Sequence, residues 1–320
     1  MFVGALVGPV HLGAANVVRA VFAHVLGLRS PLRGANDAIL WDLRLPRVVL
    51  GALVGGTLAA AGAAYQGVFR NPLADPYLLG AAAGAGLGAT IVVAYGPSGS
   101  ISRDLLPLAA FAGAAVAVVL AYTLGRTAAP AGRAAALVLA GVTVASFLTA
   151  LQTFVQQQNV DTVQEVYTWL LGRLATTGWR EVGIVLPYAL VAWIVILAHR
   201  RLLDVVAVGD EEAAALGVHV ARVRLAVVAA ATIGTAAAVA VSGLIGFVGI
   251  IVPHTIRLLV GGSYRLLLPL SVLVGAGFLV FADVLARTIM SPAELPIGVV
   301  TAFFGAPFFA VVLRTSRRTA

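Results

Sequence analysis

The stretch FRNPLADPYLLG, residues 69–80, breaks a long apolar run and gives the clearest indication of the fold. Its polar residues and two prolines fall between residues 70 and 76, while the flanking sequence consists mainly of Ala, Val, Leu and Gly. Pro72 and Pro76 lack the backbone N–H that a helix needs, so helical hydrogen bonding ends here. Asn71 offers an amide to the backbone groups left without partners. The stretch therefore predicts a sharp turn between two apolar helices.

The composition predicts that these helices cross a membrane. Hydrophobic residues make up 61% of the 320-residue chain and charged residues only 11%, whereas about a quarter of a soluble protein is charged. A spanning helix needs about 20 mostly apolar residues. Open strands are excluded, because lipid offers no hydrogen-bond partners to their unpaired backbone groups. We expect helices in nine apolar segments: 48–69, 78–95, 105–124, 134–155, 182–198, 223–245, 247–260, 266–286 and 296–313.

The expected fold is all-α, a polytopic membrane bundle that forms one domain over residues 1–320. Residues 247–260 are short for a span and predict a broken or re-entrant helix. Residues 1–8 are apolar but too short to span, and residues 9–27 predict an amphipathic surface helix. We expect nine spans plus a stub, which is either a truncated first span or the result of a start codon placed late.

The distribution of arginine predicts the orientation, because cytoplasmic loops carry an excess of basic residues. The C-terminal residues and the loops 125–133 and 199–222 are rich in arginine and fall on one side, as do 70–76 and 261–265. This side is predicted to be cytoplasmic. The other side still holds eight arginines, which topology alone does not explain: Arg29, Arg33, Arg44, Arg47, Arg103, Arg173, Arg180 and Arg287.

Missing residue types exclude several kinds of site. The chain has no Cys, which excludes disulfides and thiolate metal sites. Its five histidines show no metal-binding spacing such as HExxH, and we expect neither a metal site nor catalytic residues. All 21 basic residues are arginine, so the chain lacks the lysine of a P-loop ATPase. The net charge of +8 is interpreted as an orientation signal rather than a nucleic-acid site.

Two short motifs point to contacts with other proteins. LRLPR, residues 43–47, places Arg44 and Arg47 just outside an apolar segment, where Pro46 favours an extended or turn conformation. The two arginines are either anchors at the membrane interface or a docking site for an acidic partner. GDEEAAALGV, residues 209–218, has acidic residues at its start and Gly217 near its end, which predicts a short helix. A short acidic helix in the longest loop suits presentation to a cytoplasmic partner.

A faint internal repeat is also present. AGAAYQGVFRNP and SGLIGFVGIIVP both place a glycine ten residues before a proline, at Gly62 and Pro72 and at Gly243 and Pro253. The two strings cross in opposite directions in the predicted topology. Inverted repeats with interrupted helices are typical of transporters, although glycine-rich helices also resemble one another by chance.

Together these motifs resemble the FecCD-type permeases, the membrane subunits of type II ABC importers for haem, ferric siderophores and cobalamin. The resemblance runs from about residue 8 to 314 and is carried by 43–80 (LRLPRVVLGALVGGTLAAAGAAYQGVFRNPLADPYLLG), WLLG, GDEEAAALGV, GLIGFVGIIVPH and AELPIGVVTAFFGAPFF. It implies ten spans per subunit and a dimer, either of two identical chains or with a closely related permease. The sequence departs from the family at its N-terminus, where only a stub precedes Gly8.

The resemblance also implies roles for individual residues. It implies a cytoplasmic gate at Asn71, Leu73, Thr143 and Ser146. It implies ATPase coupling by Gly209, Asp210, Glu211, Glu212, Leu216 and Gly217, within the cytoplasmic loop 199–222. It implies docking of a periplasmic or lipid-anchored binding protein at Arg44, Arg47 and Arg287. ATP and Mg²⁺ are then bound by two partner ATPase subunits, and this chain, in the bacterial inner membrane, needs no cofactor of its own.

The substrate and the transport class leave alternatives open. Arg173, where many family members have a small residue, either meets an anionic chelate or is an interfacial residue without substrate contact. The carried chelate is expected to be haem or a ferric siderophore, with cobalamin as the alternative. An ion-coupled secondary transporter would need membrane-embedded carboxylates, and Asp283 is the only acidic residue in a late helix. An integral membrane enzyme would need a catalytic constellation, which the helices lack.

Overall fold

The computed structural model describes residues 2–8, 10, 12–97, 100–128, 134–174 and 178–316, and within these ranges the regular elements are all helical. The α-helices are α1 Phe2–Leu6, α2 Ala14–Val25, α3 Ala35–Ala38, α4 Leu45–Phe69, α5 Ala81–Tyr95, α6 Ser100–Ala128, α7 Ala134–Gln158, α8 Val163–Leu170, α9 Arg180–Ala198, α10 Arg200–Val208, α11 Asp210–Ala215, α12 Val220–Ser242, α13 Val248–Val260, α14 Tyr264–Thr288 and α15 Ile297–Ser316. A π-helix, Ile39–Arg44, joins α3 to α4, and a 3₁₀ turn, Val160–Thr162, precedes α8.

Each of the nine predicted apolar segments contains a helix, which confirms an all-helical, polytopic bundle. In the described part of the chain, six helical stretches are long and apolar enough to span a membrane: 35–69, 104–128, 135–158, 180–198, 220–242 and 264–288. Four further apolar helices in the described part of the chain are shorter: α2, α5, α13 and residues 297–310 of α15. The short α13 agrees with the prediction that residues 247–260 begin in a broken stretch, because residues 243–247 form a non-helical break after α12.

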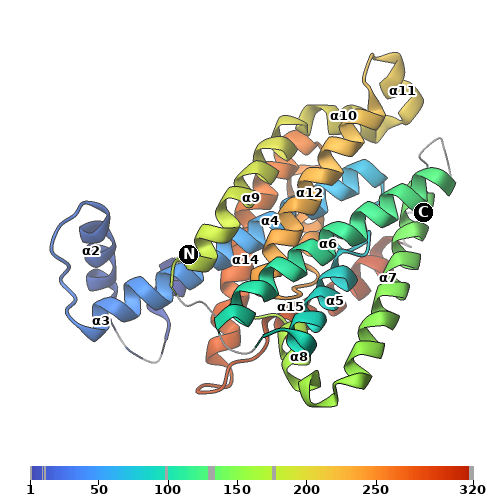
Figure 1. Cartoon of the computed structure of the whole chain (residues 1–320). Helices are drawn as coiled ribbons and strands as arrows, with labels where there is room; N and C mark the ends of the chain where they lie inside the picture. The colour runs from blue at the N-terminus through green and yellow to red at the C-terminus, as the bar shows by residue number, and fades with distance from the viewer. Residues whose placement is uncertain are drawn as a thin grey trace.

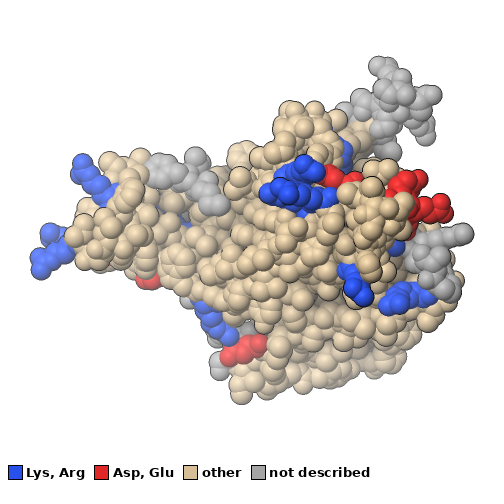
Figure 2. Space-filling model, turned by 90° about the horizontal axis from the view of Figure 1, so that it is seen from above, with Lys and Arg blue, Asp and Glu red and all other residues tan. Residues whose placement is uncertain are grey.

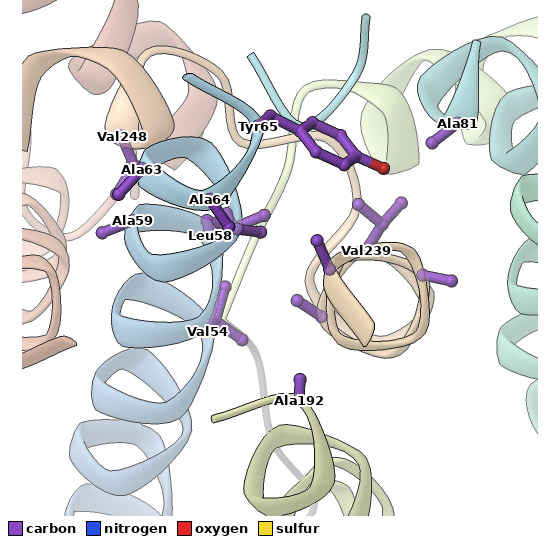
Figure 3. Close-up of a cluster of buried hydrophobic side chains, with 14 of the residues drawn as sticks. Val54, Leu58, Ala59, Ala63, Ala64, Tyr65, Ala81, Ala192, Val239 and Val248 are labelled. Atoms are coloured by element: carbon purple, nitrogen blue, oxygen red, sulfur yellow. The ribbon is translucent and has the colours of Figure 1, made fainter. Parts of the chain in front are cut away.

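The helix α4 forms the centre of the bundle. Its most apolar 18-residue window is 94% buried, against 28% for the windows of α6 and α9. Figure 3 shows side chains leaving α4 in different directions, with Ala59 and Ala63 toward Val248 of α13, and Val54 and Leu58 toward α12 and α9. A helix with small apolar residues all round is expected to be buried on every side, and α4 is.

Glycines let the central helices approach one another closely. A Cβ atom at Gly62 of α4 would collide with the backbone of Gly249 in α13, and one at Gly55 would meet the carbonyl of Gly275 in α14. Small residues at such crossings permit the backbone contact by which membrane helices associate. These contacts fix α13 and α14 against α4.

The bundle has two ends, named here by their short helices (Figure 1). The α11 end carries α10 and α11, residues 70–80 and the junction between α13 and α14. The α8 end carries α8, residues 289–296 and the start of α4. At the α11 end, Asp204 of α10 accepts a hydrogen bond from the backbone N–H of Tyr264 at 2.6 Å, which joins α10 to α14. The loops predicted to be cytoplasmic that the structure describes therefore share one end.

Two expectations about local structure need correction. Residues 43–47 are helical rather than extended: the π-helix Ile39–Arg44 runs directly into α4, and Pro46 is accommodated in the first turn of α4. The two Gly–Pro strings are not equivalent: Gly62 lies inside α4, while Gly243 ends α12 with a φ of 68°. They pack against each other instead of occupying matching positions.

The helix predicted for residues 9–27 is present over a shorter range. Residues 14–25 form the helix α2, which buries Val17, Ala20 and Ala23 and exposes Phe22 and Val25. Figure 1 shows α2 and α3 beside the start of α4, away from the main bundle. Residues 2–6 form one short helix, α1, which packs near α14 and α4.

Candidate functional site

The turn 70–80 is built from two side-chain-stabilised bends. The Asn71 Oδ1 accepts a hydrogen bond from the backbone N–H of Leu73 at 2.9 Å. The Asp75 Oδ1 accepts one from the backbone N–H of Tyr77 at 2.8 Å. Such Asn and Asp bends satisfy backbone groups that a helix would otherwise pair. Arg70 ends α4 in the left-handed region, with a φ of 49°. The predicted sharp turn is confirmed.

The turn also makes two contacts with distant elements. The Tyr77 hydroxyl donates to the carbonyl of Ile245 at 3.1 Å and lies 3.2 Å from its backbone N–H, as an acceptor. Ile245 belongs to the break between α12 and α13. On the other side, a Cβ atom at Gly141 of α7 would collide with the carbonyl of Leu78. The turn is therefore held between the helix break and α7.

Burial changes the acidity of the turn. It raises the pKa of Asp75 to about 6, with the backbone N–H of Tyr77 acting in the opposite direction. Burial also raises the pKa of the Tyr77 hydroxyl, and the nearby Asp75 carboxylate adds to this. A carboxyl with a pKa near 6 is partly protonated at mildly acidic pH.

The four residues implied as a gate lie at accessible positions of the single chain. Leu73 is 42% exposed at the tip of the turn, and Asn71 beside it is half-buried. Thr143 and Ser146 lie on the exposed face of α7, where the Thr143 hydroxyl donates to the carbonyl of Leu139 at 2.9 Å. The turn meets α7 at Gly141, two residues before Thr143.

The helix α11 separates its acidic residues into two groups. Glu211 and Glu212 are exposed, as is Leu216, with 73% of its surface accessible. Asp210 instead faces the chain's own arginines, 3.2 Å from the Arg224 Nη2 and 3.4 Å from the Arg70 Nη2. Gly217 ends the segment at a φ of 80°. The predicted short helix is confirmed, although Asp210 points inward.

The α11 end is where these charges are displayed. Figure 2 looks onto it and shows a group of basic side chains with acidic ones beside it, on a mostly neutral surface. A groove of about 490 Å³ runs beside α11 and the start of α12. Its lining residues are Asp210, Ala214, Gly217, Val218, His219, Val220, Ala221 and Arg222.

At the α8 end, two arginines bind one buried carboxylate, that of Asp283. The Arg47 guanidinium lies 2.8 Å from the Asp283 carboxylate. It also donates two hydrogen bonds, of 2.9 and 2.8 Å, to the Glu294 carboxylate. Arg287 lies 3.1 Å from Asp283 on the same helix. The bond from Arg47 holds the pKa of Glu294 below its usual value. This cluster joins α4, α14 and the loop before α15.

The cluster changes the expected picture of the outer arginines. Arg44 is only 5% exposed and donates to the carbonyls of Ala5, Leu6 and Val10 at 2.6 to 3.2 Å. Arg287 donates to the carbonyls of Gly4 and Val7. Neither guanidinium projects into solvent, because both donate to carbonyls of the N-terminal segment. Their partners are backbone carbonyls, which sequence patterns do not reveal.

Arg173 belongs to neither of the charged groups at the two ends. The Arg173 side chain is exposed, and its backbone N–H donates to the carbonyl of Ser242 at 2.7 Å. In the described residues no group of His, Asp or Glu is arranged to hold a metal ion. The sequence motifs assign no site role to Arg70, Tyr77, Arg224, Asp283 or Glu294, although Arg70 and Tyr77 lie within the motif of residues 69–80.

Comparisons with known proteins agree with this arrangement. Residues 1–315 match the FecCD transport family. The chain is 41% identical to the ABC transporter permease YvrB of Bacillus subtilis, covering 99% of this chain and 91% of that protein. It is 40% identical to the cobalamin import system permease BtuC of Halobacterium salinarum, covering 96% and 81%. It is 39% identical to the hemin transport permease HmuU of Yersinia pestis, covering 86% and 85%.

A solved structure shares the fold. It is an inward-facing metal-chelate type ABC transporter, with a TM-score of 0.81 and 29% identity, and the match covers 94% of this chain and 98% of that one. The family match over nearly the whole chain, the relatives above 30% identity and this shared fold lead to one conclusion. The chain is a member of the FecCD transport family, whose relatives include permease components of ABC importers.

Proposed function

We propose that this chain is the permease subunit of an importer that carries a large iron chelate, either haem or a ferric siderophore, across the cytoplasmic membrane. The observation that carries the proposal is the FecCD match over residues 1–315. ATP hydrolysis takes place in separate subunits, because the chain has no lysine with which to build a P-loop.

The ATPase subunits contact the exposed side of α11 in this proposal. Glu211, Glu212 and Leu216 face outward and form the contact, and Gly209 and Gly217 bound the helix. ATP and Mg²⁺ are bound by those partners. The α11 end is then cytoplasmic, in agreement with the arginine-rich loops.

A second copy of the chain, or a closely related permease, completes the pathway. The exposed face of α7 supports this, since only 33% of its most apolar window is buried and it carries Thr143 and Ser146. The two faces meet across a central path, with Asn71 and Leu73 at its cytoplasmic mouth. The shorter apolar helices α5, α13 and α15 count as spans in this arrangement.

A soluble binding protein docks at the α8 end. The arginine cluster supplies a positive field there, and Arg47, whose side chain is 15% exposed, is the member that also reaches the exposed Glu294. Arg44 and Arg287 contribute through this field, because their guanidinium groups are occupied by backbone carbonyls. Charges of this kind speed and orient an encounter more than they tighten it.

The substrate is assigned by chemistry alone. The exposed Arg173 suits the carboxylates of haem or of a siderophore, since arginine binds carboxylates through two parallel hydrogen bonds. Cobalamin is the second candidate, because the permease of Halobacterium salinarum that is named for it is 40% identical.

The test reconstitutes the chain with its ATPase subunits in liposomes and offers binding protein loaded with haem, a ferric siderophore or cobalamin. Uptake that requires ATP, with haem or a ferric siderophore as the preferred cargo, is the expected result. An ATPase variant without its P-loop lysine is the matched control. Uptake driven by an ion gradient without ATP would instead identify a secondary transporter, and preferred cobalamin uptake would change the substrate.

A further inference from the structure

One carboxylate at the α11 end is shared by three elements. Asp210, in the first turn of α11, accepts from the Arg224 Nη2 with both of its oxygens at 3.2 Å. The same carboxylate lies 3.4 Å from the Arg70 Nη2. Arg224 lies near the start of α12, and Arg70 is the residue that ends α4. Asp210 therefore connects α11 to the ends of two helices of the bundle core.

The rest of α11 has little hold on the bundle. Gly209 precedes it, and Gly217 follows it at a φ of 80°, a conformation that glycine adopts without strain. Within the helix, only Ala213 is fully buried. The helix is thus a small body between two glycines, and its position depends on Ala213 and on the ion pairs of Asp210.

Arg70 passes this connection into the turn 70–80. It directly precedes Asn71, and the bends at Asn71 and Asp75 hold the turn together as one unit. The turn in turn contacts the helix break through Tyr77 and α7 through Leu78. A displacement of α11 that moves Asp210 relative to Arg70 makes or breaks this ion pair, and the turn is then held differently against α7.

Arg224 is the more buried of the two arginines that bind Asp210. Its side chain is only 7% exposed, against 41% for that of Arg70. Moving Asp210 away from Arg224 takes a carboxylate from a nearly buried guanidinium, which is costly. The exposed guanidinium of Arg70 can exchange the same carboxylate for water. The difference in burial predicts that Asp210 stays with Arg224 and that the Arg70 pair is the variable contact.

We propose that Asp210 is a positioning residue that couples α11 to the turn 70–80 through Arg70, so that movement of α11 changes the accessibility of the turn. The proposal rests on the function proposed above, in which α11 contacts an ATPase. It separates Asp210 from Glu211 and Glu212, which face outward. In this proposal Glu211 and Glu212 contact the ATPase, and Asp210 transmits the movement of α11 to the turn.

The experiment measures the turn directly. The chain has no cysteine, so Leu73→Cys, at a 42% exposed position, provides a single site for N-ethylmaleimide. Its labelling rate is measured in the purified complex with ATPase subunits, without nucleotide and after trapping with ATP and vanadate. We expect the rate to change about fivefold or more between the two states, the size of a modest coupling free energy.

The variants remove the contact in steps. Arg70→Gln and Asp210→Asn are each expected to abolish most of this change while ATP hydrolysis persists, and the double variant is expected to lose no more than either alone. Arg70→Lys keeps the charge and should retain part of the response. The matched control is Arg180→Gln, which breaks a similarly exposed ion pair with Asp104 at the α8 end and should leave the response unchanged.

The outcomes separate this inference from the proposed function. A full response in Arg70→Gln would overturn the coupling role, as would an unsubstituted complex that hydrolyses ATP without any change in labelling. In both cases the importer assignment stands. If the ATPase subunits do not bind the chain, the proposed function fails and the inference fails with it.

Discussion

At the scale of single residues, the α8 end shows how the strength of an ion pair depends on burial. Asp283 has a side chain that is 2% exposed and lies between Arg47 and Arg287. Glu294, which also binds Arg47, is 50% exposed. A buried charge that loses its partner is strongly destabilising, whereas an exposed pair contributes little. The same arginine thus forms one structural contact and one marginal contact.

Replacing the two carboxylates should reveal this difference. Asp283→Asn is expected to lower the free energy of unfolding by about 3–5 kcal/mol, because the largely buried Arg287 loses its anion and Arg47 keeps only the half-exposed Glu294. Glu294→Gln should cost only about 0.2–1 kcal/mol. Thermal unfolding of the purified chain in detergent measures both. Equal losses would show that burial does not set the strength of these pairs.

The raised pKa of Asp75 predicts a pH effect. Its value of about 6, against an ordinary value of 3.8, means that the folded chain binds this proton more tightly than the unfolded chain. Stability should therefore fall as pH rises from about 4 to about 6, by about 3 kcal/mol for this group, and then level off.

Asp75→Asn tests this effect because it keeps the oxygen that accepts from the Tyr77 N–H. The variant should lose this part of the pH dependence and be the more stable protein at pH 7. Unfolding in detergent is followed from pH 4 to pH 8. An unchanged slope in the variant would assign the pH dependence to other groups.

At the scale of elements, α11 is the clearest case of a segment whose role follows from what it exposes. A six-residue helix is too short to be stable alone, so its contacts with the bundle must hold it. Its exposed residues include two glutamates and a leucine, which suit a partner surface with basic groups around an apolar hollow.

Reversing the outward charges should disrupt the partner contact. Glu211→Arg with Glu212→Arg is expected to reduce ATP-dependent uptake at least about tenfold, because like charges across an interface cost several kcal/mol. The amount of chain in the membrane should stay the same. Uptake in vesicles and co-purification of the ATPase subunits are the measurements. A double variant that keeps both would place the ATPase contact elsewhere.

At the scale of the whole molecule, the distribution of charge determines how the bundle sits in its membrane. The described Arg-rich loops 199–222 and 261–265 lie at the α11 end, and the cluster around Asp283 lies at the other. Three arginines of the α8 end, Arg44, Arg47 and Arg287, are bound to acidic residues or to backbone carbonyls. With the α11 end cytoplasmic, as proposed, this internal use accounts for three arginines on a side where the positive-inside rule disfavours them.

The orientation can be tested with two single cysteines. Leu216→Cys, at the α11 end, and Val160→Cys, at the α8 end, are 73% and 71% exposed, respectively. In intact cells an impermeant maleimide should label only Val160→Cys, and both should react after the membrane is opened. Labelling of Leu216→Cys from outside would reverse the assignment of the two ends.

The sequence by itself determined the helices, the turn at residues 70–76 and the short helix α11. These features depend on apolar length, proline chemistry and the acidic and glycine signals at helix ends, which all act within a few residues. Only the tertiary structure decided which charges meet. Arg44 binds carbonyls 34 to 39 residues away, Arg47 binds carboxylates 236 and 247 residues away, and Asp210 turns toward Arg70. Such pairings depend on how helices far apart in the chain pack around α4, and no local pattern encodes that packing.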